Sequence, residues 1–216
     1  MRAVLWDLDG TLVDSEPYHW QAWYATMAAE GLAITREQFR ATFGQRNDLI
    51  VAQWLGSDVA PDRARQIGDA KEARYRRLVR QAGLAPSPGA AEWVKRLQQE
   101  GWRQAIASSA PRRNVEVVLE LLRFSDCFQA TVAAEDVQRG KPDPQVFLLA
   151  ASRLGAPPSR CIVVEDAAAG IEAARRAGMR SVGLSRTGAA LPADLVVGCL
   201  TALPPDAFRG LLGDAV

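Results

Sequence analysis

The chain alternates short apolar runs with longer amphipathic segments, and its rhythm changes once along its length. Residues 2–6 form a short apolar run that predicts a buried strand. From Pro17 to Gly31 the apolar positions recur at helical spacing, with proline near the start and glycine at the end, as is typical of helix boundaries. Three further helices are predicted after it, over 36–42, 47–55 and 61–81. The first part of the chain therefore predicts one strand followed by helices alone.

Beyond the turn at 85–89, which contains two prolines and a glycine, helical and strand patterns alternate. The predicted helices are 89–100, 112–122, 144–154 and 168–177, and the predicted strands are 104–107, 131–132, 161–164, 181–184 and 195–197. This alternation indicates an α/β fold with a parallel sheet and helices on both faces. We expect a core made of residues 1–14 and 85–216, with a small all-helical domain, residues 15–84, inserted after the first strand.

The charge balance gives no support to a nucleic-acid or membrane surface. The 216 residues include 26 Lys and Arg against 25 Asp and Glu, a formal net charge of +1. No apolar run approaches the ~20 residues that a membrane span needs. Cys127, Cys161 and Cys199 lack the spacing of metal ligands and suit reduced thiols. The chain enters a strand almost at once, so we expect no secretory signal, and we expect a cytoplasmic monomer with neither nucleic acid nor membrane as partner.

Polar residues follow four of the predicted strands. They are Asp7 and Asp9, Ser108 and Ser109, Lys141, and Glu165 and Asp166. Because ligands of an open parallel sheet bind beyond the carboxyl ends of its strands, these side chains should meet in one crevice. Carboxylates without His or Cys favour Mg²⁺, whereas a lysine and hydroxyl groups suit phosphate oxygens. A carboxylate can attack phosphorus once its repulsion is screened, so the set predicts phosphoryl transfer.

These motifs, DLDGT, SS, KP and VVED in that order, resemble those of the haloacid-dehalogenase superfamily of phosphatases and phosphomutases. The resemblance spans nearly the whole chain and implies a Rossmann-like core with a helical cap after the first motif. It implies that Asp7 is the nucleophile, forming an aspartyl-phosphate, and that Asp9 is the general acid and then the base. Asp7, the backbone carbonyl of Asp9 and Asp166 would bind Mg²⁺, with Glu165 either a ligand or a supporting acid.

The same resemblance assigns the phosphate-holding groups. Ser108 and Lys141 would hold the phosphoryl group during catalysis, and Gly10, Thr11 and Ser109 would order or line its site. Ser108 and Ser109 also suit the N-cap of the helix predicted after them, which is a purely structural alternative.

The inserted helices resemble the cap of the β-phosphoglucomutase family. His19, Arg46 and Lys71 match its substrate-side residues, although each also suits an ordinary polar position on an amphipathic helix. Two departures stand out: Arg46 comes one place early, where Asn47 fills the expected position, and Pro111 stands where the mutase has lysine. Both weaken the grip on a second phosphate that a mutase needs.

The sequence therefore predicts an Mg²⁺-dependent phosphatase of small, sugar-phosphate-like metabolites. A phosphosugar mutase of the β-phosphoglucomutase type is the alternative. A catalytically silent binding module is a third reading, against which the complete set of strand-end residues argues. Asp14 and Ser15, between the first motif and the helical insert, suit a hinge or the cap of the next helix.

Overall fold

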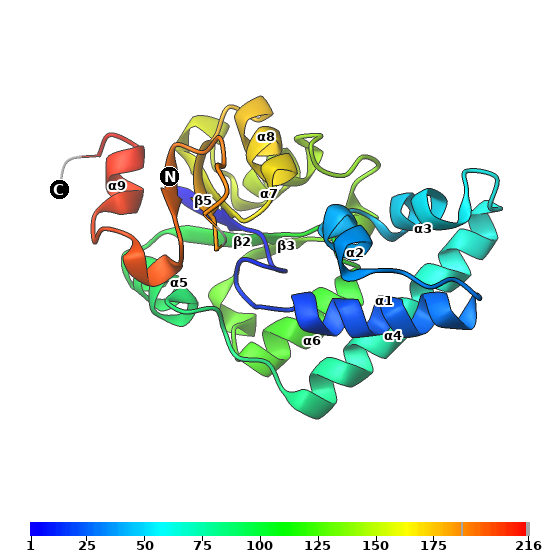
Figure 1. Ribbon diagram of the computed structural model, residues 1–216. Coiled ribbons are helices and arrows are strands. Elements are labelled where there is room, and N and C mark those ends of the chain that lie inside the picture. Colours follow the sequence, from blue (N-terminus) through cyan, green and yellow to red (C-terminus); the bar gives the residue numbers. More distant parts are fainter. Residues whose placement is uncertain (187, 215–216) are drawn as a thin grey trace.

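The computed structural model describes residues 1–186 and 188–214, and a parallel sheet forms its centre (Figure 1). The strands of this six-stranded sheet lie in the order β3-β2-β1-β4-β5-β6. They are β1 Ala3–Trp6, β2 Arg103–Ala107, β3 Ala130–Val132, β4 Cys161–Glu165, β5 Arg180–Leu184 and β6 Leu195–Val197. The helices are α1 Glu16–Ala29, α2 Arg36–Thr42, α3 Asn47–Leu55, α4 Pro61–Ala82, α5 Ala90–Gln99, α6 Arg112–Leu122, α7 Gln145–Leu154, α8 Ala168–Arg176 and α9 Ala207–Leu211. The fold is the Rossmann-like α/β architecture that the sequence predicted.

Strand β1 is buried on both faces, which explains why it is apolar throughout. It pairs in parallel with β2 on one side and β4 on the other. Val4 and Trp6 point into the hydrophobic cluster under α5 and α6, whereas Ala3 and Leu5 point into the cluster under α7 and α8. Alternate side chains of a strand point to opposite faces, so a strand covered by helices on both sides needs an unbroken apolar run.

Helices α1 to α4 form a helical block beside the sheet, on the side away from both chain ends (Figure 1). A hydrophobic cluster of its own, with Trp23, Met27 and Phe39 at its centre, holds the block together. Tyr24, which follows Trp23 in the same helix, lies outside this cluster and is 52% exposed. Consecutive side chains point about 100° apart around the helix axis, so Trp23 points inward while Tyr24 points outward. Tyr24 lies against Trp20, with their ring centroids 5.3 Å apart.

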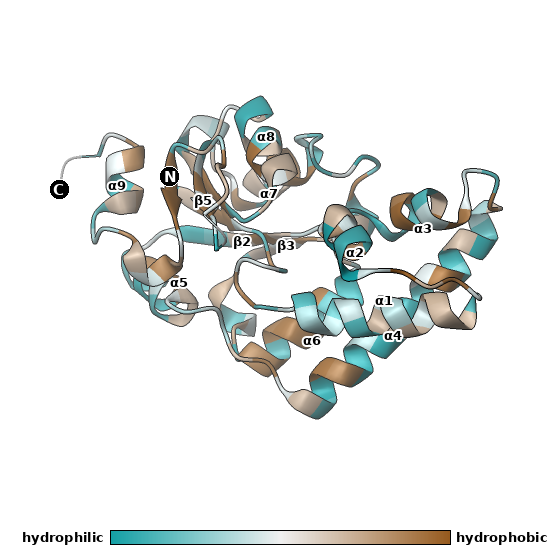
Figure 2. Ribbon diagram, viewed as in Figure 1, coloured by the Kyte–Doolittle hydropathy of each residue, from teal (hydrophilic) through white to brown (hydrophobic). Residues whose placement is uncertain are grey.

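Helix α4 is the longest helix of the block and is mostly hydrophilic (Figure 2). Its buried positions recur every three or four residues: Ala64, Ile67, Gly68, Lys71, Glu72, Tyr75 and Val79. Two charged residues therefore lie on the buried stripe of the helix. No helix among the described residues combines the length and the apolarity that crossing a membrane requires.

The sheet order places a crevice between β1 and β4. These strands are neighbours, yet the chain leaves β1 toward β2 and β3 on one side and leaves β4 toward β5 and β6 on the other. Loops that diverge in this way leave an opening beyond the carboxyl ends of the two strands, where ligands of such sheets bind. Asp7 follows β1, and Asp166 follows Glu165 at the end of β4.

Candidate active site

The loop after β1 separates two carboxylates that are only two residues apart. The amide of Asp7 still donates to Val164 O of β4 at 3.0 Å, and the chain then folds back so that Leu8 O accepts the amides of Leu12 and Val13. Gly10 adopts φ +91°, in the left-handed region that favours glycine. A Cβ at Gly10 would lie 2.0 Å from Asp166 Oδ2, so only glycine lets Asp166 reach this loop.

Lys141 lies at the centre of the acidic residues. Its Nζ is 2.5 Å from Asp7 Oδ1 and 2.6 Å from Glu165 Oε1, and its side chain is only 5% exposed. Glu165 Oε2 accepts the amide of Ala167 at 2.8 Å, so both oxygens of Glu165 are engaged within the protein. The side chains of Asp7, Lys141 and Glu165 therefore meet at one place, while their catalytic roles stay predictions.

The three carboxylates of Asp7, Glu165 and Asp166 could hold a cation. One oxygen of each lies within 4.8 Å of the others. Burial raises the pKa of Asp7 well above its ordinary range, and repulsion from Glu165 and Asp166 adds to this, while Lys141 opposes it. Burial and Glu165 likewise raise the pKa of Asp166 to about 7. A hard divalent cation would offset this repulsion, and an all-oxygen donor set fits Mg²⁺. The Asp9 carboxylate is not in this set, so its predicted metal contact, through the backbone carbonyl, stays a prediction.

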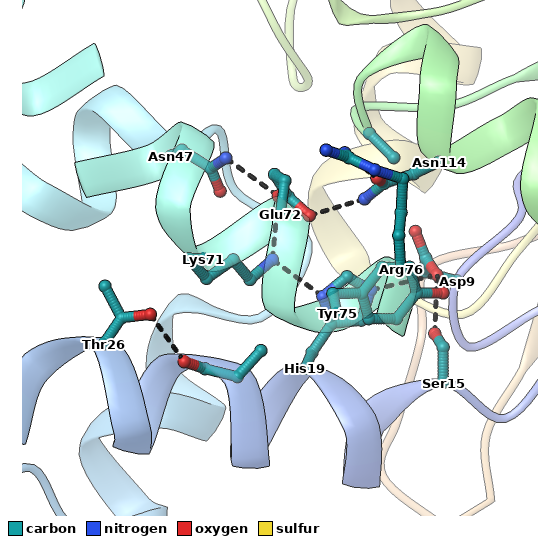
Figure 3. Close-up of polar contacts among 12 residues, drawn as sticks. Asp9, Ser15, His19, Thr26, Asn47, Lys71, Glu72, Tyr75, Arg76 and Asn114 are labelled. Atoms are coloured by element: carbon teal, nitrogen blue, oxygen red, sulfur yellow. Dashed lines mark hydrogen bonds and ion pairs between the residues drawn. The ribbon is translucent and has the colours of Figure 1, made fainter. Parts of the chain in front are cut away.

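Asp9 faces away from that cluster toward the helical block. Its Oδ1 accepts a hydrogen bond from Ser15 Oγ at 2.6 Å and lies 3.2 Å from His19 Nε2 (Figure 3). Tyr75 stacks on the His19 ring at 3.9 Å. Burial alone would raise the pKa of Asp9, but the hydrogen bonds from His19 and Ser15 and the nearby charge of Lys71 outweigh it and lower the pKa. Ser15 was expected to cap α1 or form a hinge; its hydroxyl accepts no capping hydrogen bond from α1 and donates to Asp9.

His19 is held from its other side by a buried charged pair. Lys71 Nζ lies 2.8 Å from His19 Nδ1 and 2.8 Å from Glu72 Oε1 (Figure 3). Since an ammonium group can only donate, Nδ1 accepts and Nε2 carries the proton that points at Asp9. Asn47 Nδ2 donates to Glu72 Oε1 at 2.8 Å as well. Lys71 is only 3% exposed, which excludes the alternative that it is a solvated helix residue.

The hydroxyl side of the site differs in detail from the expectation. Ser108 is buried, and its Oγ accepts the amide of Ala110 at 3.0 Å, which leaves its own proton available to a ligand. The N-cap alternative for Ser108 and Ser109 is wrong, because α6 begins at Arg112 with Pro111 in the capping position. Thr11 Oγ1 lies 3.5 Å from Asp166 Oδ1, so Thr11 lies on the acidic side of the loop.

A cavity of about 920 Å³ joins these groups between the sheet and the helical block. Asp7, Asp9, Ser108, Ser109, Lys141, Glu165 and Asp166 line its sheet side, and His19, Arg46 and Lys71 line the block side. Arg46 Nε lies 3.2 Å from Asp48 Oδ1, and Arg46 Nη1 donates to Val137 O at 3.4 Å. The predicted residues other than Gly10 and Thr11 therefore share one cavity, but Arg46 already has partners.

Four residues with close contacts in or beside the site were not predicted from the sequence. Glu72 and Tyr75 lie on the buried stripe of α4, and Asn114 lies on the buried face of α6. Gly170 lets Glu165 approach α8, since a Cβ there would be 1.9 Å from Glu165 Oε1. Each carried a local signal, namely a polar residue on a buried helix stripe or a glycine inside a helix.

Known proteins resemble this chain over most of its length. The model of the haloacid dehalogenase-like hydrolase family matches residues 1–178. Protein CbbY of Rhodobacter capsulatus is 34% identical over 192 residues, which cover 84% of each chain. Hexitol phosphatase B of Escherichia coli K12 is 33% identical over 186 residues, covering 83% of this chain and 82% of the relative. The crystal structure of β-phosphoglucomutase from Clostridium difficile superimposes with a TM-score of 0.89 at 25% identity, covering 99% of this chain and 97% of that one. The chain therefore belongs to the haloacid dehalogenase-like hydrolase family.

Proposed function

We propose that the protein is an Mg²⁺-dependent phosphatase of small phosphorylated metabolites, working through an aspartyl-phosphate on Asp7. One observation carries the proposal: the carboxylates of Asp7 and Asp9, two residues apart, have different partners. Asp7 contacts Lys141 within the acidic cluster, whereas Asp9 contacts Ser15 and His19. This difference suits a nucleophile beside an acid–base group.

In the first step Asp7 attacks phosphorus and the bond to the leaving oxygen breaks. Lys141, whose pKa burial would lower but Asp7 and Glu165 raise, stays cationic and screens the phosphoryl charge. Ser108 can donate its free hydroxyl proton to a phosphoryl oxygen. Bound at Asp7 and Asp166, Mg²⁺ would supply further charge neutralisation. Glu165 orients Lys141 without being consumed, because its second oxygen is fixed by Ala167 N.

Asp9 handles the proton. It gives one to the leaving oxygen in the first step, and the negative charge of an arriving phosphate favours the protonated form that this requires. In the second step Asp9 takes a proton from water, and that water attacks the aspartyl-phosphate and frees Asp7. His19, which donates from Nε2, and Ser15 fix the direction of the Asp9 carboxylate.

The helical block acts in this proposal as a cap, residues 15–84, over a core of residues 1–14 and 85–216. It supplies one wall of the cavity, and closing that wall would exclude bulk water until the intermediate forms. Monomeric state and cytoplasmic location stay predictions.

A β-phosphoglucomutase-type mutase is the second candidate. The His19–Lys71 pair and the likeness to a solved β-phosphoglucomutase favour it. Two features favour the phosphatase instead. Pro111 offers no charge to a second phosphate, and Arg46 is engaged by Asp48 and Val137 O.

The test is a substrate panel. Incubation with Mg²⁺ and phosphosugars, including hexitol phosphates and β-glucose 1-phosphate, should release inorganic phosphate, and EDTA should abolish the release. Isomerised sugar phosphate without phosphate release would support the mutase. Asp7→Asn should be folded and inactive, while Asp9→Asn should stall as the phospho-enzyme, detected by intact-protein mass. Turnover that survives Asp7→Asn would refute the mechanism.

A further inference from the structure

The carboxylate of Glu72 joins the helical block to the sheet-bearing part of the chain. Its Oε2 accepts Asn114 Nδ2 of α6 at 2.5 Å, while its Oε1 accepts Lys71 and Asn47 from the block itself (Figure 3). Asn114 is 1% exposed, and its Oδ1 accepts a hydrogen bond from Arg76 Nη1 of α4 at 2.8 Å. Each polar end of the Asn114 amide therefore contacts α4.

These contacts complete a series that begins and ends in the sheet-bearing part of the chain, here called the sheet side, and passes through the helical block. Asp9, in the loop after β1, contacts His19 of α1, which contacts Lys71 of α4, whose neighbour Glu72 contacts Asn114 of α6. We call this series the Asp9–Asn114 path. Its two end residues belong to the sheet side, and its three middle residues belong to the helical block. The path can be continuous only when the block is seated on α6.

The Asn114 contact is not needed to satisfy the block internally. With α4 lifted away from α6, Glu72 would keep Lys71 and Asn47 as partners, because all three belong to the block. A buried polar group without a hydrogen-bond partner costs free energy. Polar groups that pair across two packed surfaces therefore favour the one arrangement of the surfaces in which all of them are paired. The pairing therefore depends on docking.

We propose that Asn114 is a positioning residue: by receiving Glu72 it seats the helical block on α6 and so holds His19 against Asp9. The inference rests on the proposed function for its catalytic consequence, though not for the docking itself. According to this inference α6, which carries none of the reacting residues, aligns the acid–base residue Asp9 when the helical block closes.

The test uses an isosteric change. Asn114→Asp keeps the volume and keeps an acceptor for Arg76, but it sets two carboxylates against each other where Glu72 was bound. We expect kcat to fall about 10–100-fold, the scale of a misplacement near 1 Å, with little change in KM. Asn114→Ala, which removes the contact without repulsion, should cost less. Glu116→Ala is the matched control, because Glu116 is an exposed residue of the same helix.

A swapped pair separates positioning from a general loss of fold. In Glu72→Gln/Asn114→Asp the amide and the carboxylate exchange places, so the hydrogen bond can form again. The swap should recover part of the kcat lost in Asn114→Asp, and the double-variant loss should be smaller than the product of the two single losses. No recovery, or a kcat for Asn114→Asp equal to that of Glu116→Ala, would overturn the proposal.

Small-angle scattering with Mg²⁺ and inorganic phosphate reads the docking without any turnover. Asn114→Asp should have a larger radius of gyration than wild type, and the swapped pair should return toward wild type. If no phosphoester in the panel is turned over, the proposed function fails while the scattering still decides the docking. An unchanged radius in Asn114→Asp would refute the docking, and a changed radius with unchanged kcat would refute its link to Asp9.

Discussion

Removing the positive charge of Lys141 should destabilise the protein more than any exposed lysine change. Lys141→Met keeps an unbranched side chain of similar shape as far as Cε but removes the ammonium that binds Asp7 and Glu165, so the two carboxylates face each other without it. Lys141 is 5% exposed, and the two carboxylate side chains are 10% and 1% exposed. Solvent therefore does little to screen the charges that remain.

The magnitude follows from the two hydrogen bonds, 2.5 Å and 2.6 Å long. A hydrogen bond to a charged group contributes about 1.5–3 kcal/mol to stability. Removing one partner of a buried ion pair lowers stability by about 3–5 kcal/mol, because the other charge stays buried without a partner. We therefore expect the free energy of unfolding to fall by about 3–5 kcal/mol. For a chain of this length that corresponds to a Tm lower by about 6–20 °C.

Thermal unfolding followed by circular dichroism in EDTA measures the effect. Lys95→Met is the control, since Lys95 is exposed on α5 and the substitution is the same; its Tm should stay near wild type. Mg²⁺ should then raise the Tm of Lys141→Met more than that of wild type, because the variant's carboxylates lack their protein cation. Equal Tm values for the two variants in EDTA would refute the view of Lys141 as the central counter-charge.

Three further outcomes are expected. Gly170→Ala should reduce kcat on the order of tenfold with the far-ultraviolet spectrum unchanged, because a Cβ 1.9 Å from Glu165 Oε1 must displace that side chain; wild-type kcat would contradict the close packing. Iodoacetamide should label Cys199 well before Cys161, because a hydrogen bond from Thr201 lowers the pKa of Cys199 whereas burial raises the pKa of Cys161 to about 11. Peptide mass spectrometry measures the order of labelling, and the reverse order would contradict this expectation. Burial alone would raise the pKa of Glu72, but Lys71 outweighs it, so the folded pKa lies below the unfolded one. Its carboxylate therefore stabilises the fold above the unfolded pKa of about 4.3, and this is lost as the pH falls through the folded pKa. The Tm gap between wild type and Glu72→Gln should accordingly narrow from pH 7 toward pH 3, and a constant gap would argue against the shift.

The strand-end residues could be predicted because sheet geometry is general. An apolar run such as 3–6 identifies a buried strand, and any polar residue directly after it lies at the carboxyl edge of the sheet. Asp7 and Asp166 were placed by that rule from segments more than a hundred residues apart, and Lys141 was placed in the loop that follows β3. Helix boundaries at 47–55 and 112–122 also agree with the structure, because the local periodicity and the flanking residues determine them.

The partners of Asp9 could not be predicted in the same way. Serine is a common N-cap residue, and nothing in the sequence around Ser15 distinguishes helix capping from a hydrogen bond to Asp9. Lys71 and Glu72 lie on the stripe of α4 that helical periodicity places inward, but their partners depend on the angle at which α4 crosses α1 and α6. That angle results from side-chain packing over the whole helix rather than from the pattern around either residue.

The sequence by itself thus determined the sheet, the polar edge of its strands and the kind of chemistry there, since these follow from short-range periodicity and from the chemistry of the side chains. The tertiary structure decided which carboxylate faces the acidic cluster of Asp7, Glu165 and Asp166 and which faces the helical block. It also decided that Glu72 contacts Asn114 of α6. Contacts between distant segments depend on how two packed surfaces meet. The free energy that favours one packing arrangement over another is the sum of many side-chain interactions, and the local sequence pattern does not predict that sum.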